Sequence, residues 1–145
     1  TLYGDMNGGF NPVKHLYKTQ VYAMVEWLNA NLPTGVYGPD GVVIPENIIT
    51  KAPTAELKPD QTDQDTLPPY DVLDDILQCL VENELSHDEI VERGHDGQIV
   101  SKVERMLYLA EYKRRQSAPG VKITQKLFGR DRRYPITNRF IEKTN

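Results

Sequence analysis

Apolar residues recur at intervals of three and four along most of this chain, and this helical period constrains its fold more than any other feature. The first run follows Asn11 and Pro12, which suit the N-cap and first position of a helix, and it ends before Pro33. Its apolar face is Leu16, Tyr17, Val21, Met24, Val25 and Leu28. The second run begins after Pro69, and its face is Val72, Leu73, Ile76, Leu77, Leu80 and Val81. We therefore expect two amphipathic helices that each bury one face.

Helix-start signals mark two further segments. Ser86, with Glu89 three residues later, forms a capping box, which predicts a short helix that ends at Gly94. Asp96 is a suitable N-cap for a longer helix, which we expect to continue into residues 111–115. The inward face of that helix is Ile99, Val100, Val103, Met106, Leu107 and Ala110.

The remaining segments are connections. Residues 34–44 are rich in turn formers and end in Val-Val-Ile, which predicts a short strand, and residues 45–49 predict one helical turn. Residues 50–68 hold several Pro and Asp residues, and a loop of this length is typically functional or disordered. From residue 116 the chain is punctuated by Pro and Gly, and we expect an extended tail. The predicted fold class is mostly α with one or two short strands, from which a parallel sheet cannot be built.

Composition limits the classes of protein that remain. The chain has 145 residues, enough for one domain with a core. No apolar run approaches the roughly 18 residues that a membrane span needs, so no membrane partner is expected. The single cysteine, Cys79, lies within the apolar ILQCLV, which favours a buried thiol over a nucleophile and fits a reducing cytoplasm.

Charge is distributed unevenly along the chain. Residues 102–145 hold twelve Lys and Arg against four Asp and Glu, a balance of +8, which leaves −12 for the rest of a chain whose net charge is −4. The basic end could bind a polyanion, or it could face the acidic part of this chain or of another subunit. Nucleic acid is disfavoured because only Phe128 and Tyr134 are interleaved with the basic residues near RDRRY.

Three segments carry a resemblance to a known family. YGDMNGGFNP at 3–12, KAPTAEL at 51–57 and EYKRRQ at 111–116, in this order and spacing, resemble the carboxy-terminal part of NAD synthetase. The continuation KRRQSAPGVKIT resembles the bacterial glutamine-dependent branch. The resemblance implies that residues 1–145 are a fragment of an α/β Rossmann-like synthetase domain of the ATP pyrophosphatase type. It also implies a lid loop at 50–68, a basic carboxy-terminal tail at 116–145 and a homodimeric, cytoplasmic enzyme.

The resemblance implies a particular chemistry. In the family, ATP and Mg²⁺ activate the nicotinate carboxylate of deamido-NAD as an acyl-adenylate, and ammonia released from glutamine then displaces AMP to give NAD. A carboxylate is a poor electrophile, so the reaction needs this leaving group. Cations must offset the repulsion between the phosphates of two substrates, and a cover must keep water from the adenylate.

Family position assigns six residues to substrates. Lys18, Lys51 and Thr54 would bind ATP, and Thr1, Leu2 and Lys113 would bind deamido-NAD. From the residues alone, Lys18 is a solvated charge, Thr54 is part of a turn and Lys113 is a cation that suits the last turn of a helix. Asp60, Asp63 and Asp65 are expected to be solvated loop surface rather than metal ligands.

Other family features are missing from the 145 residues. Ammonia-dependent relatives place Lys, Asp and His where this chain has Leu2, Gly9 and Tyr112, so those contacts are not carried over. The Ser-Gly-Gly-x-Asp-Ser phosphate loop, the acidic metal ligands and the Cys-Glu-Lys set of the amidase do not occur. We therefore expect no catalytic residue and no metal ligand here, and no activity from this chain alone. The alternative is a non-catalytic helical fragment that docks on a partner or polyanion through its basic tail.

Overall fold

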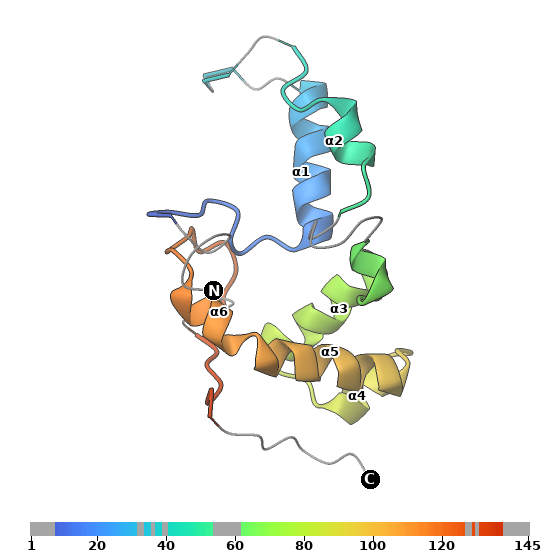
Figure 1. Ribbon diagram of the computed structural model, residues 1–145. Coiled ribbons are helices and arrows are strands. Elements are labelled where there is room, and N and C mark those ends of the chain that lie inside the picture. Colours follow the sequence, from blue (N-terminus) through green and yellow to red (C-terminus); the bar gives the residue numbers. More distant parts are fainter. Residues whose placement is uncertain are drawn as a thin grey trace.

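The described part of the chain is helical, and one core lies among some of its helices (Figure 1). The computed structural model describes residues 8–31, 34–35, 37–38, 41–53, 62–126, 129 and 131–137. The helices are α1 (Lys18–Asn31), α2 (Glu46–Thr50), α3 (Tyr70–Val81), α4 (His87–Glu92), α5 (Gly97–Leu109) and α6 (Glu111–Gln116), with a 3₁₀ turn, η1, at Asp63–Asp65. None of the helices in these ranges is long and apolar enough to cross a membrane.

The core lies where α3, α4 and α5 pack together. Its buried members are Leu73, Ile76, Cys79, Leu80, Val81, Ile90, Val100, Val103 and Leu107. Removing each large apolar side chain from water contributes about 1.5–3 kcal/mol, so this cluster is the main source of stability among the described residues. The predicted face of the 70–81 helix and the buried thiol of Cys79 are confirmed. The face predicted for the 97–109 helix is confirmed for Ile99, Val100, Val103 and Leu107, whereas Met106 and Ala110 are not part of the core cluster.

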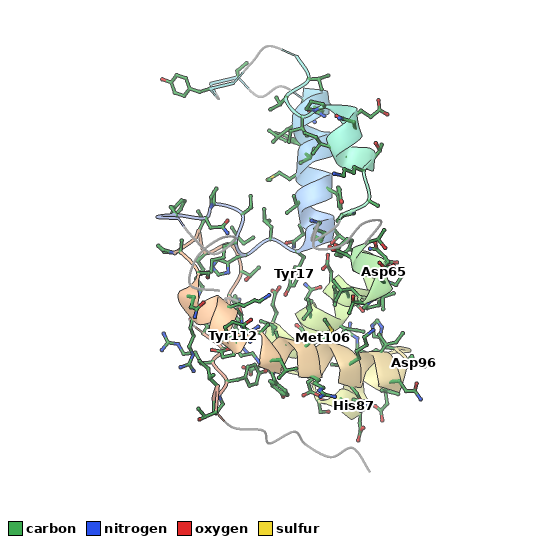
Figure 2. The ribbon with its side chains drawn as sticks, in the orientation of Figure 1. Tyr17, Asp65, His87, Asp96, Met106 and Tyr112 are labelled. Carbon is green, nitrogen blue, oxygen red and sulfur yellow. The ribbon has the colours of Figure 1, made fainter. Side chains whose placement is uncertain are left out.

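Local capping fixes the ends of α4 and α5. The Glu89 carboxylate accepts the Ser86 backbone N–H at 2.7 Å, and the Ser86 hydroxyl accepts the Glu89 N–H at 3.4 Å. The Asp96 carboxylate accepts the N–H groups of Gln98 and Ile99 at 2.8 and 3.0 Å. Figure 2 shows Asp96 at the start of α5 and His87 on α4, at the end of the molecule away from Tyr112. Both predicted helix starts are therefore confirmed.

The predicted start of the first helix is wrong. Residues 12–15 form a turn, and α1 begins at Lys18. The Asn11 N–H is already bonded to the Pro119 carbonyl at 2.8 Å. The helix is capped instead across the fold, because the Asp74 carboxylate of α3 accepts the Thr19 N–H at 2.8 Å.

The predicted short strand is also absent from the described part of residues 34–44. A strand needs the backbone groups of a neighbouring strand. Here the Asn29 side chain of α1 takes them: its oxygen accepts the N–H groups of Val43 and Ile44, and its amide donates to the Ile44 carbonyl at 2.8 Å. The segment is thus tied to α1 as a loop, and the turn predicted at 45–49 follows as α2.

The helix predicted to run from Asp96 into residues 111–115 is broken at Ala110. A separate helix, α6, begins at Glu111, whose side chain is buried.

Helices α1 and α2 stand away from the core (Figure 1), and no described residue of α1 is buried. Consequently Trp27 on α1 is 52% exposed.

Candidate functional site

Two clefts of the described structure adjoin at Lys18, which lines both. The first, of about 530 Å³, opens between α1, α2 and η1. It is lined by Lys18, Tyr22, Asn47, Ile48, Lys51, Ala52, Pro53 and Asp63. The fold therefore brings Lys18 and Lys51, which are distant in sequence, to one cavity.

Aromatic rings hold the Lys18 ammonium group at this cleft. It lies 6.0 Å from the centre of the Tyr22 ring and 5.6 Å from that of Tyr70, within the range of cation–π attraction. The Tyr70 hydroxyl donates to the Asp63 carboxylate, and burial together with this bond raises the pKa of the Tyr70 phenol. Tyr70 thus remains neutral while it orients a cation and a carboxylate at the cleft.

The long loop begins and ends at this cleft. The Asp63 N–H donates to the Pro53 carbonyl at 3.0 Å, and both residues line the cavity. Residues 54–61, and with them Thr54 and Asp60, lie outside the described residues. Asp65 is a capping residue: its carboxylate accepts the Thr62 N–H at 2.8 Å and the Thr62 hydroxyl at 3.0 Å, which lowers the pKa of Asp65.

The second cleft, of about 350 Å³, lies between the 11–18 segment, α3 and α6. It is lined by Asn11, Lys14, Leu16, Tyr17, Lys18, Asp74, Leu77, Ala110, Lys113, Arg114 and Ser117. Four of these residues are cationic and one is acidic, and the acidic one, Asp74, already caps α1. The wall therefore carries an excess of positive charge, which suits a ligand with phosphate or carboxylate groups.

Lys14 is a partly buried cation of the second cleft. The Lys14 ammonium donates to the Ala118 carbonyl at 2.7 Å, which joins the 11–18 segment to the start of the tail. Burial lowers the pKa of Lys14. Lys14 therefore acts first as a brace between two segments of the wall.

The predicted site residues have different outcomes. Three of them line the clefts: Lys51 the first, Lys113 the second and Lys18 both. Thr1 and Leu2 lie outside the described residues. Their assignment to substrates stays a prediction. Gly9 and Tyr112 are exposed and line neither of these clefts. In the described ranges, no three His, Cys, Asp or Glu side chains are grouped so that they could hold a metal ion.

Sequence reasoning missed several residues of the clefts. Arg114 had a signal, because it stands beside Lys113 in the KRRQ segment. Lys14 had none, because its place depends on the tail folding back over residues 11–14. Burial raises the pKa of the Cys79 thiol, against a smaller opposing effect of Arg93, so this cysteine is unsuited to act as a nucleophile.

Clefts walled by ammonium and guanidinium groups are typical of proteins that bind anionic ligands. Comparison with known proteins names the class: the sequence model of the NAD synthase family matches residues 1–117, and the chain belongs to this family. It is 51% identical over 144 residues to the glutamine-dependent NAD(+) synthetase of Rhodobacter capsulatus, covering 99% of this chain and 26% of the relative. It is also 51% identical over 142 residues to that of Thermotoga maritima, covering 98% of this chain and 23% of the relative.

A solved structure is also similar. The glutamine-dependent NAD+ synthetase from Acinetobacter baumannii, determined in complex with ADP, matches with a TM-score of 0.52 and 40% identity, over 99% of this chain and 23% of that one. The chain thus spans about a quarter of the length of the relatives it matches.

Proposed function

We propose that this chain is part of a glutamine-dependent NAD synthetase, which converts deamido-NAD to NAD with ATP and with ammonia from glutamine. The observation that carries the proposal is the convergence of Lys18, Lys51 and Lys113 on two adjoining clefts in a chain of this family. The nicotinate carboxylate would be activated as an acyl-adenylate before ammonia attacks it. Cations on the cleft walls would offset the phosphate charge of both substrates.

We assign the first cleft to ATP. Lys18 and Lys51 would contact its phosphates, and Thr54 would add a hydroxyl from the loop. The Acinetobacter baumannii relative was solved in complex with ADP, which supports an adenine nucleotide as a ligand of the whole protein. The loop at 50–68 would close as a lid over ATP and the adenylate. The hydrogen bond between Pro53 and Asp63 supports this, because it fixes both ends of the loop at the rim of the cleft.

We assign the second cleft to deamido-NAD. Lys113 would contact this substrate from α6, and Thr1 and Leu2 would continue the pocket. The excess of positive charge on the cleft wall supports a ligand that carries a pyrophosphate.

We assign the chemistry that these residues lack to other parts of the protein. The phosphate loop, the amidase residues and the ligands of Mg²⁺ would come from outside residues 1–145, because the sequence contains none of these motifs and the described residues offer no fitting metal cluster. The chain would thus be the carboxy-terminal portion of a Rossmann-like synthetase domain, in a cytoplasmic homodimer. By itself it would form no NAD.

The test is NAD formation by the full-length protein from ATP, deamido-NAD and glutamine. Lys18→Met should raise KM for ATP, and Lys113→Met should raise KM for deamido-NAD, each by about tenfold or more, because a charge-assisted contact to phosphate is lost. Lys102→Met is the matched control, since Lys102 is an exposed cation of α5 outside both clefts. An unmodified protein that forms no NAD would overturn the function, and variants no different from Lys102→Met would overturn the site.

A further inference from the structure

A two-point clasp holds the carboxy-terminal tail against α6. The Glu111 carboxylate, in a residue that is 1% exposed, accepts hydrogen bonds from Arg114 Nη2 and Arg115 Nε, both at 2.9 Å, and from the backbone N–H of Tyr134. Arg115 Nη2 in turn donates to the Tyr134 carbonyl at 2.9 Å. Side chains of α6 therefore form hydrogen bonds with both the backbone N–H and the backbone carbonyl of Tyr134.

The Tyr134 side chain anchors the same point of the tail. Its ring meets that of Tyr108 edge-on, with ring centres 4.2 Å apart and planes at 73°. The Arg132 guanidinium lies 5.1 Å from the centre of the Tyr134 ring. Tyr134 also packs against the buried core, and Tyr108 donates to Glu104 at 2.7 Å. The tail is thus docked on α5 as well as on α6, and the clasp is a structured contact rather than a surface ion pair.

The clasp is linked to the second cleft through Arg114. One nitrogen of its guanidinium donates both to Glu111 and to the Leu107 carbonyl, the latter at 2.6 Å, and Arg114 also lines the cleft beside Lys113. The other end of α6 is held where Lys14 donates to the Ala118 carbonyl. Lys113 is exposed and has no hydrogen bond of its own side chain among the described contacts, so its position depends on how α6 is held.

We propose that Arg115 is a positioning residue for the second cleft: with Glu111 it clasps the tail at Tyr134 and so fixes the orientation in which α6 presents Lys113 and Arg114 to the ligand. This inference rests on the proposed function for the identity of that ligand, deamido-NAD. Arg115 is not part of the cleft wall, and its side chain is 44% exposed. Its removal therefore acts on substrate binding through α6, without deleting a cleft contact or a core side chain.

The experiment compares Arg115→Met with Arg133→Met in the full-length protein. Arg133 is an exposed residue of the same tail with no hydrogen bond or ion pair of its side chain in the described structure, so the control removes the same charge without removing a bond of the clasp. Arg115→Met should raise KM for deamido-NAD about fivefold while kcat and KM for ATP stay within about twofold. Backbone amides of residues 131–137 should exchange faster in Arg115→Met and not in Arg133→Met.

Each outcome decides one question. An unchanged KM for deamido-NAD with faster exchange would overturn the positioning role and leave only a tail anchor. The positioning role would also be overturned if KM rose equally for both substrates, or if Arg133→Met raised KM for deamido-NAD as much as Arg115→Met does. If the unmodified protein forms no NAD, the proposed function and its substrate fail. The exchange readout then still tests the clasp, which unchanged protection in Arg115→Met would refute.

Discussion

Replacing Gly120 with Ala should loosen the contact between the tail and the 11–14 turn. A Cβ at position 120 would lie 2.5 Å from the Asn11 carbonyl oxygen and 2.8 Å from Lys14 Cβ. Ordinary contacts of this kind begin near 3.4 Å, so the backbone must separate by about 0.6–0.9 Å. Overpacking of this size typically costs about 1–3 kcal/mol. The separation should weaken the hydrogen bond from the Asn11 N–H to the Pro119 carbonyl, because that bond lies at the point of closest approach.

The assay for Gly120→Ala is amide hydrogen exchange at Asn11 in the full-length protein. A cost of 1–3 kcal/mol corresponds to an opening equilibrium that rises by about fivefold to 150-fold, and Asn11 should lose protection by that factor. Gly9→Ala is the matched control. A Cβ at position 9 would meet no atom within 4 Å, and the backbone of Gly9 does not have a positive φ. If Gly120→Ala leaves the protection of Asn11 as it is in Gly9→Ala, the close packing inferred at this point is wrong.

Two further predictions concern the clasp and the loop. Burial alone would raise the pKa of Glu111, but hydrogen bonds from Arg115 and Arg114 hold it below its ordinary value, so the stability it contributes is present above pH 4.5 and is lost as the pH falls through the folded-state pKa. Thermal unfolding measured from pH 6 to pH 3 should show this loss, and the slope should be smaller in Glu111→Gln, in which the other carboxylates of lowered pKa, such as Asp65, remain; an equal slope in both proteins would contradict it. Limited proteolysis should cut between Thr54 and Thr66, and ATP with deamido-NAD should protect the loop. Cutting at the same rate with and without these substrates would argue against the lid.

Local signals in the sequence were enough for the core helices. The period of α3 and the side-chain caps Ser86 and Asp96 act within a few residues, so they can be found without the fold. The start of α1 could not be predicted, because its capping carboxylate, Asp74, comes from another helix. The strand expected near Ile44 failed for the same kind of reason, since its backbone bonds are taken by a side chain of α1.

The candidate site was likewise predicted only in part. Lys18, Lys51 and Lys113 were named from the resemblance, and the fold places them at two adjoining clefts. The residues alone predict a solvated charge for Lys18 and a cation that suits the last turn of a helix for Lys113. Lys14 and the clasp at Tyr134 depend on a tail without regular structure that returns to an earlier segment, and no local pattern encodes such a return.

The long-range cap of α1 has a consequence for the order in which the protein is made. Thr19 is synthesised 55 residues before Asp74, the residue whose carboxylate satisfies its N–H. At roughly 5–20 residues per second, the ribosome needs several seconds to add the segment between them. Contacts between residues so distant in sequence also form slowly, because a long loop must close first. The helix that carries Lys18, the residue common to both clefts, is therefore translated before the other described helices, and the cap of its first turn can form only after Asp74 has been made.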